Sequence, residues 1–294
     1  MAVYSGPDLS VHNGYVDMKA VARAGHNFVM IRDGFGDLLS YPNQKDSRFE
    51  INYNNAKLAG LSVGTYHYMY ATTVAGAKRE AEGFLANIKG KKFDMPIALD
   101  IEERSQYNLP NSAVEAIVKA FMDVCEAAGY YCVLYSYEAF LSGKMSASFR
   151  SKYDIWCANI SNTPSIPYGI WQYTFTGTIT GVNSRVDLNR TTKDYPTLIK
   201  NAGKNGLSKD TKKVLDSSGL KYGDSGIAVL AYKQLLIALK QAGIITQGVD
   251  NNDKFGEGTK KATNELLASG NYSQNGIAGE NTIKYAGKIL KGSV

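Results

Sequence analysis

Three carboxylates lie close together in the stretch MPIALDIEER, residues 95–104. The short apolar run before them, bounded by a proline, predicts a buried strand. Because side chains two residues apart on a strand share a face, Asp100 and Glu102 are expected side by side and Glu103 on the other face. Two like charges on one face are either solvated at the strand end or form a catalytic pair whose repulsion raises one pKa.

The elements that position these carboxylates alternate between strand-like and helix-like segments over the first 195 residues. About five strand–helix units are followed by about three strand-like segments with little room for helices between them. Repeated units of this kind imply a parallel sheet with right-handed crossovers, and eight strands suggest an α/β, TIM-like barrel whose last third is irregular. We expect strands near 2–10, 27–34, 62–70, 95–102, 130–137, 152–160, 169–177 and 184–190, and helices near 16–25, 48–60, 75–90 and 111–129.

In such a barrel the carboxyl ends of the strands face one mouth, where catalysis occurs. Asp8 is expected to end the first strand and Asp187 the last, so both join Asp100 and Glu102 there. Carboxylic acids protonate a glycosidic oxygen and stabilise an oxocarbenium-like centre, and aromatic faces stack on sugar rings. The aromatic residues expected at other strand ends are Tyr66, Tyr68, Tyr135, Trp156 and Trp171.

Each of these residues has a simpler explanation when it is taken alone. Asp8 fits a turn or a helix cap, and Asp187 fits a surface pair with Arg185 or Arg190. The tyrosines fit a core with hydrated hydroxyl groups. The coincidence of strand-end positions is what favours a shared site.

Composition changes sharply near residue 195. The later part holds 14 lysines, no arginine and 8 acidic residues, which accounts for the whole formal net charge of +6. Both tryptophans and 16 of the 20 tyrosines lie before residue 196, and no proline follows Pro196. We therefore predict a domain over 1–195, a basic linker over 196–219 and a small all-α domain of three helices over 220–294.

Several classes of function are disfavoured by the sequence. Cys125, Cys132 and Cys157 show no CxxC spacing and resemble buried apolar residues, and the three histidines lie far apart, so we expect no metal or other cofactor. No apolar run approaches the roughly 20 residues that span a bilayer. We expect no nucleic-acid partner, no membrane insertion and no signal peptide, hence synthesis in a host cytoplasm.

Eight motifs in the first 195 residues together resemble the glycoside hydrolase family 25 lysozymes. They are, in order, GPDLSVHNG, MIRDGFG, VGTYHYMY, IALDIE, LYSY, IWCANI, GIWQYT and VDLNR. The resemblance implies a (β/α)5β3 barrel and a muramidase that cuts the β-1,4 bond between N-acetylmuramic acid and N-acetylglucosamine. The family's Asp-x-Glu acids match Asp100 and Glu102, and its first-strand and last-strand aspartates match Asp8 and Asp187. In MIRDGFG, Arg32 and Asp33 would lie near the substrate, Asp33 standing where the family commonly has a small residue.

The C-terminal part is similar to the small three-helix peptidoglycan-binding domains. The similarity lies in a Gly-Asp-Ser-Gly motif before the first expected helix, FGEGTKKA at the second and NGIAGENT at the third. An EF-hand interpretation of DNNDKFGEGTKK fails, because its sixth residue is Phe255 rather than glycine and no glutamate stands at position twelve. The lysines of the C-terminal part either form an ordinary solvated surface or attract anionic wall polymers.

These features predict a phage-type endolysin that acts at the bacterial wall after release, with peptidoglycan as its partner. Glu102 would be the general acid, assisted by Asp100. A chitinase is disfavoured because the DxxDxDxE motif is not met, and a zinc amidase because the histidines are scattered. The alternatives that stay open are a catalytically inactive protein that binds wall sugars, and a glycosidase acting on another N-acetylated glycan. The sequence also leaves the oligomeric state open, with association through the C-terminal domain one possibility.

Overall fold

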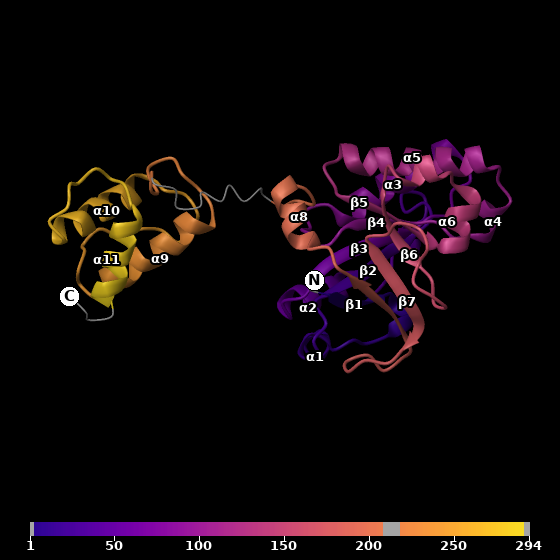
Figure 1. The fold of residues 1–294 in the computed structure, drawn as a ribbon, viewed down its shortest axis with the longest axis horizontal. Coiled ribbons are helices and arrows are strands. Elements are labelled where there is room, and N and C mark those ends of the chain that lie inside the picture. The colour runs from indigo at the N-terminus through magenta and orange to yellow at the C-terminus, as the bar shows by residue number, and fades with distance from the viewer. Residues whose placement is uncertain (1–2, 208–217, 291–294) are drawn as a thin grey trace. The chain divides into compact units, whose positions relative to one another are not determined.

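The expected alternation of strands and helices is present in the computed structural model, which describes residues 3–207 and 218–290 (Figure 1). The chain divides into two units, one over 1–209 and one over 210–294. The first unit contains a closed barrel of eight strands. Its strands are β1 (Tyr4–Leu9), β2 (Phe28–Phe35), β3 (Ser62–Tyr68), β4 (Ile97–Asp100), β5 (Cys132–Tyr137), β6 (Asp154–Ala158), β7 (Ile170–Gly177) and β8 (Val186–Thr191).

The last strand closes the barrel in the opposite direction from the others. Strands β1 to β7 pair in parallel with their neighbours along the chain, whereas β8 runs antiparallel to both β7 and β1. Asp187 therefore lies near the start of β8. The sequence analysis expected it at the end of that strand. Because β8 is reversed, its start reaches the same mouth as the carboxyl ends of the parallel strands, and Asp187 stands opposite Asp8 in the β1–β8 register.

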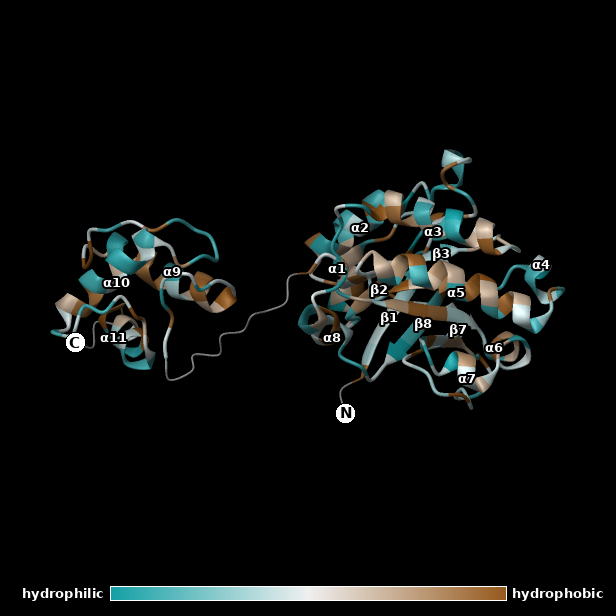
Figure 2. Cartoon of the chain, turned by 90° about the horizontal axis from the view of Figure 1, so that it is seen from above, coloured by the Kyte–Doolittle hydropathy of each residue, from teal (hydrophilic) through white to brown (hydrophobic). Residues whose placement is uncertain are grey.

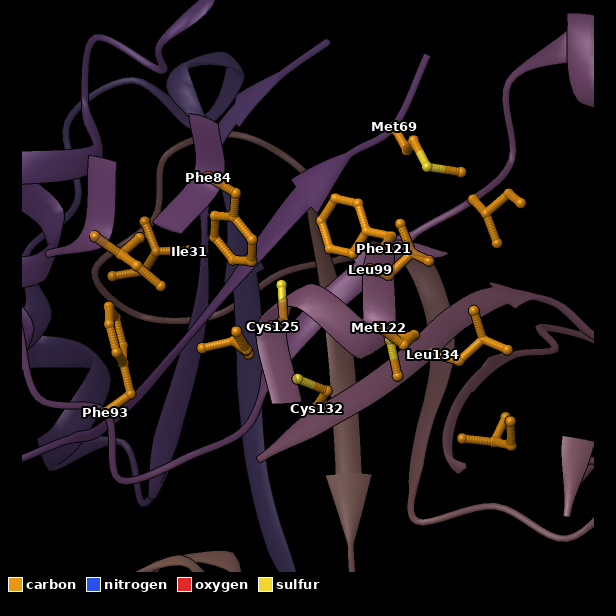
Figure 3. Close-up of a cluster of buried hydrophobic side chains, with 14 of the residues drawn as sticks. Ile31, Met69, Phe84, Phe93, Leu99, Phe121, Met122, Cys125, Cys132 and Leu134 are labelled. Carbon is orange, nitrogen blue, oxygen red and sulfur yellow. The ribbon is translucent and has the colours of Figure 1, made fainter. Parts of the chain in front are cut away.

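Helices cover the outside of the barrel with their apolar faces. Buried side chains of α3 and α5 pack on outward-facing residues of the strands, and Figure 3 shows Phe84 and Phe121 beside Leu99 in this outer core. Polar residues occupy the other side of these helices (Figure 2). The helical segments of this unit are η1 (Val11–Asn13), α1 (Met18–Arg23), η2 (Pro42–Gln44), α2 (Phe49–Leu58), α3 (Val74–Ile88), α4 (Arg104–Tyr107), α5 (Asn111–Ala127), α6 (Glu138–Lys144), α7 (Ala147–Arg150) and α8 (Tyr195–Ala202).

A second apolar cluster fills the inside of the barrel and includes helix α8. Tyr195 and Ile199 of α8 are fully buried against residues such as Phe28 and Met95, which belong to the amino-terminal end of the barrel. Asn205, also buried, accepts from the Tyr131 amide and donates to the Met95 carbonyl. The linker predicted over 196–219 therefore starts too early, because apolar burial draws the chain onto the barrel through at least residue 205. Residues 208–217 of that linker lie outside the described residues.

The second unit contains three helices in its described residues: α9 (Ile227–Gln241), α10 (Glu257–Ser269) and α11 (Glu280–Leu290). Its core includes Leu236 of α9, Leu266 of α10 and Ala286 of α11. Phe255 stacks on Tyr232 with ring centroids 6.1 Å apart, which ties the loop before α10 to α9. None of the described helices in either unit is both long enough and apolar enough to cross a membrane.

A lysine ammonium organises the DNNDK loop of this unit. Lys233 of α9 is fully buried, and its ammonium binds the side chains of Asp250 and Asn252 and the carbonyl of Lys254. These three oxygen acceptors come from alternate residues of the loop, so an internal cation holds them. This explains in physical terms why the loop keeps its turn without the glycine and glutamate of an EF-hand.

A charged cluster is buried in the outer core beside the barrel. The ring of His67 packs against both Phe84 and Phe121, with Nδ1 2.8 Å from Asp33 Oδ1 and Nε2 3.0 Å from the Gly36 carbonyl oxygen. Burial lowers the pKa of His67, but the charge and hydrogen bond of Asp33, joined by Glu80, raise it to about 9. His67 is therefore a protonated core residue whose two N–H groups both donate.

This cluster predicts a loss of stability at alkaline pH. The pKa of His67 rises from 6.5 to about 9 on folding, so its contribution is fully present below pH 6.5 and is lost as the pH rises through about 9. The shift corresponds to a contribution on the order of 3 kcal/mol. We expect the unfolding free energy, measured by denaturant titration, to decline over this range and to decline much less in His67→Gln.

His26→Gln is the matched control, because His26 lies outside the cluster and contacts the Ser5 hydroxyl. It should keep the alkaline decline of the wild type. Equal pH dependence in wild type and His67→Gln would contradict the assignment.

Candidate active site

Carboxylates from three distant segments meet in one cavity of about 320 Å3 at the barrel mouth. Asp100 ends β4 and Glu102 follows it, Asp8 comes from β1 and Asp187 from β8. The cavity thus brings together all four predicted acids. Its lining residues are Asp8, Ser10, His12, Asn13, Arg32, Tyr66, Tyr68, Asp100, Glu102, Tyr135, Trp156, Arg185 and Asp187.

Strand alternation explains why these side chains share the cavity. Ala98 belongs to the inner cluster, whereas Leu99 and Ile101 belong to the outer one. The inward positions therefore continue from Ala98 to Asp100 and Glu102, with period two. The same alternation turns Leu188 outward and leaves Asp187 on the inside.

Two of the acids carry buried oxygen atoms without hydrogen-bond partners. Asp100 Oδ1 and Glu102 Oε2 are both in this condition, and Asp100 is 4% exposed. Burial is the main cause that raises the pKa of Asp100 well above its usual value, followed by the charges of Glu102 and Asp8, with Arg32 acting in the opposite direction. Such a carboxyl group is poised to hold a proton or to contact a ligand.

The pKa of Glu102 lies near neutrality. Burial, then the charges of Asp8 and Glu103, raises its pKa to about 7. The repulsion within the Asp100–Glu102 pair raises the pKa of Asp100, whereas we expected it to raise that of Glu102. The pKa of Asp187 rises to about 8 through burial and the charges of Asp8 and Glu102.

Asp8 is held by two buried side-chain amides that sequence analysis missed. Gln172 Nε2 and Asn189 Nδ2 each donate to Asp8 Oδ2 over 2.8 Å. Strand periodicity offered a signal for Asn189, since it stands two residues after Asp187 on the same face. Gln172 carried no signal, because its role depends on how β7 lies against β1 across the barrel.

Aromatic rings and one arginine form the wall of the cavity. Trp156 packs against Tyr135 and Tyr66, with ring centroids 4.6 and 5.8 Å away. Arg32 points inward from β2 and pairs with Asp46 through Nη2 at 2.9 Å. Four predicted aromatic residues, Tyr68 among them, thus line the site together with Arg32.

Two predicted substrate-binding residues lie outside the cavity. Asp33 follows the inward Arg32, so it faces the outer core, where it binds His67 and Asn87. Trp171 stands near the amino-terminal start of β7, away from the mouth, and the Arg190 guanidinium lies over its ring at 3.9 Å. Asp33 differs from the prediction because its position in β2 turns it outward. Trp171 differs because only strand pairing shows that β7 starts at Ile170, next to it.

Glu103 was expected to point away from the acids and to be replaceable. It does not line the cavity, but its Oε2 accepts from the Tyr68 hydroxyl over 3.2 Å, and its charge raises the pKa of Glu102. Glu103 therefore acts on the site through Tyr68 and through its field. Four lining residues were not predicted at all: Ser10, His12, Asn13 and Arg185.

A larger cavity, of about 530 Å3, lies near the amino-terminal starts of β5 and β6. It contains the carboxylate of Asp154, which is already bound by Tyr131, Tyr195 and Lys193. Because this carboxylate is satisfied and stands alone, we place the chemistry at the smaller cavity. No group of three or more His, Cys, Asp or Glu residues suited to a metal ion occurs in residues 3–207 or 218–290.

The chain is similar to known cell-wall hydrolases. The model of the family "Glycosyl hydrolases family 25" matches residues 7–182. The autolytic lysozyme of Clostridium acetobutylicum is 29% identical over 187 residues, which cover 63% of this chain and 54% of that protein. The match thus spans about half the length of that relative.

Two solved structures share the fold. A bacterial lysozyme from Streptomyces coelicolor matches with a TM-score of 0.59 and 26% identity, over 71% of this chain and 100% of that one. The CTP1L endolysin matches with a TM-score of 0.59 over 98% of this chain and 99% of that one. At 21% identity, this second likeness concerns the fold alone.

The site geometry predicts an unusual titration of Glu102. We expect the titration of Glu102, followed by NMR of its carboxyl carbon, to have a midpoint at a pH of about 7. The Asp8→Asn variant should lower this midpoint, because it removes a charge that opposes ionisation. Glu82→Gln, an exposed change on α3, should leave it unmoved. A Glu102 midpoint near the ordinary glutamate pKa of 4.5 would contradict the site as described.

Proposed function

The chain belongs to glycosyl hydrolases family 25, and on that premise we propose that it is a muramidase of bacterial peptidoglycan. The bond cleaved is the β-1,4 bond between N-acetylmuramic acid and N-acetylglucosamine. The observation that carries this proposal is a partly buried Glu102 with a pKa of about 7, which shares an aromatic-lined cavity with three other carboxyl groups. The names of the similar lysozymes support the substrate class.

Glu102 is the general acid in this proposal. A carboxyl group with a pKa near neutrality is still protonated in part at the working pH, so it can donate its proton to the glycosidic oxygen as the bond breaks. Burial keeps the proton on Glu102 until the leaving oxygen accepts it. The partnerless Oε2 atom is free to make that contact.

Asp100 supports the reaction without donating the proton. By similarity to the family, the substrate's own N-acetyl oxygen attacks the anomeric carbon, and Asp100 orients that group through its partnerless Oδ1. Asp8 and Asp187, which stand opposite each other in register, hold the network or position the water. Tyr66, Tyr68, Tyr135, Trp156 and Arg32 bind the sugar rings and their polar groups.

The architecture assigns a role to each unit. We interpret the barrel as the (β/α)5β3 type, since no helix separates β6, β7 and β8 in the described part of this unit. The three-helix unit would bind the cell wall and keep the enzyme near an insoluble substrate. The whole chain would then serve as an endolysin that acts at the wall after release. The full-length likeness in fold to an endolysin supports this arrangement.

Replacing Glu102 tests the acid. Glu102→Gln preserves shape and hydrogen bonding but has no proton to give, so we expect at least about a hundredfold loss of activity, with the fold intact. The measurement is the release of new reducing ends at muramic acid, identified by mass spectrometry of peptidoglycan fragments. In the wild type, activity should fall as the pH rises through about 7, because Glu102 ionises.

Glu103→Gln is the matched control. It keeps an acceptor for Tyr68, so the maximal rate should stay within a few-fold of the wild type. Its alkaline limb should move to lower pH, because the charge of Glu103 raises the pKa of Glu102. A folded Glu102→Gln protein with native activity would eliminate the acid assignment.

Removing the C-terminal unit tests the anchor. A protein ending at residue 209, which keeps α8 and Asn205, should hydrolyse soluble wall fragments at the native rate but lose activity on intact cells. Residues 210–294 should bind purified walls without hydrolysis. Binding should weaken in salt if lysines contribute, since exposed charges are screened beyond about 8 Å at physiological ionic strength. If this piece fails to pellet with walls at any salt, it is no anchor.

A further inference from the structure

We propose that Gln172 and Asn189 are positioning residues that lock Asp8 into one orientation for glycosidic cleavage. The inference deepens the proposed function and depends on it. Neither residue is among those that line the cavity, so each would act on the reaction through Asp8. Both are buried, at 1% and 0% exposure, and both reach the same oxygen of Asp8.

The chemistry of its neighbours fixes the orientation of the Asn189 amide. The indole N–H of Trp156 can only donate, and it donates to Asn189 Oδ1 over 2.8 Å. The Gly6 carbonyl can only accept, and it lies 3.2 Å from Asn189 Nδ2. A flipped amide would break both contacts, so Nδ2 must face Asp8.

Gln172 links Asp8 to the aromatic wall. Its Nε2 donates to Asp8 Oδ2, and its Oε1 accepts from the Tyr135 hydroxyl over 2.7 Å. The proton of Tyr135 is thereby committed to Gln172. The phenolic oxygen then offers lone pairs to the cavity, where it accepts from an N–H or O–H group of the sugar.

Two donors on one oxygen oppose the cost of burying Asp8. Burial raises its pKa, and the hydrogen bonds from Asn189 and Gln172 act against that rise. The titratable and charged groups that face this network are Asp187 across the β1–β8 register, Asp100 and Glu102 after β4, Arg32 on β2, and the hydroxyls of Tyr66 and Tyr135. The pKa of Asp8 stays above its usual value, and without the amides it would rise further.

The test exchanges the amide of Gln172 for a carboxyl group. In Gln172→Glu, a protonated carboxyl still donates to Asp8 and accepts from Tyr135. Once ionised it only accepts, and it sets a like charge against Asp8. We therefore expect kcat on soluble peptidoglycan fragments to be near native at about pH 4.5. The ratio of variant to wild-type kcat should fall at least about tenfold by about pH 8.5.

Gln172→Met and Asn205→Asp complete the design. Gln172→Met removes both hydrogen bonds, so its kcat should be lower by about tenfold to a hundredfold at every pH. Asn205→Asp alters a buried amide of the α8 end of the barrel, so it should lower stability while the shape of its pH profile stays native.

Two results would overturn the inference: a folded Gln172→Glu protein whose kcat ratio is constant or rises with pH, or a Gln172→Met protein with native kcat. If Glu102→Gln is inactive in the same assay, such a result rejects the positioning role alone. If Glu102→Gln is fully active, the proposed function itself fails.

Discussion

The candidate site depends on the way the barrel closes. Strand β8 enters between β7 and β1 in the reverse direction, so the amino-terminal start of one strand meets the carboxyl ends of the others. The register of β1 and β8 then sets Asp187 opposite Asp8. The same pairing carries Asn189 to the buried side of Asp8, while β7 supplies Gln172 from the neighbouring strand. A parallel eighth strand would send Asp187 to the far end of the barrel.

Gathering four acids in one buried place opposes folding, because each carboxylate loses hydration and repels the others. The barrel offsets this in two ways. All four acids have raised pKa values, so protons can neutralise part of their charge. In addition, Asp8 accepts hydrogen bonds from two amides, which limit the rise of its pKa. Burial and repulsion thus place the pKa of Glu102 at about 7, the range that the proposed general acid needs.

The rest of the barrel provides stiffness around this site. Alternate residues of each strand fill an inner cluster, which Tyr195 and Ile199 of α8 close, and an outer core under α3 and α5. The protonated His67 ties β2 to β3 through Asp33 within the outer core. In the C-terminal unit a lysine has the organising role, since Lys233 gathers the loop before α10. Buried cations thus fix loops or strands in both units through hydrogen bonds to oxygen.

Local pattern in the sequence determined a good deal: the number and order of the barrel strands, the inward phase of Asp100 and Glu102, and three C-terminal helices. Period-two alternation and helix periodicity are properties of short segments, which is why they can be read without a fold. The tertiary structure alone decided the direction of β8, the burial of α8, the outward turn of Asp33 and the remote position of Trp171. It also supplied Gln172 and Asn189 as partners of Asp8. The closure by β8, the burial of α8 and the two partners of Asp8 arise from contacts between residues more than a hundred positions apart, such as Asn205 with Met95 at a separation of 110. The position of Trp171 depends on the pairing of β7 with β6, and that of Asp33 on its contact with His67, 34 residues away. No local pattern encodes these contacts.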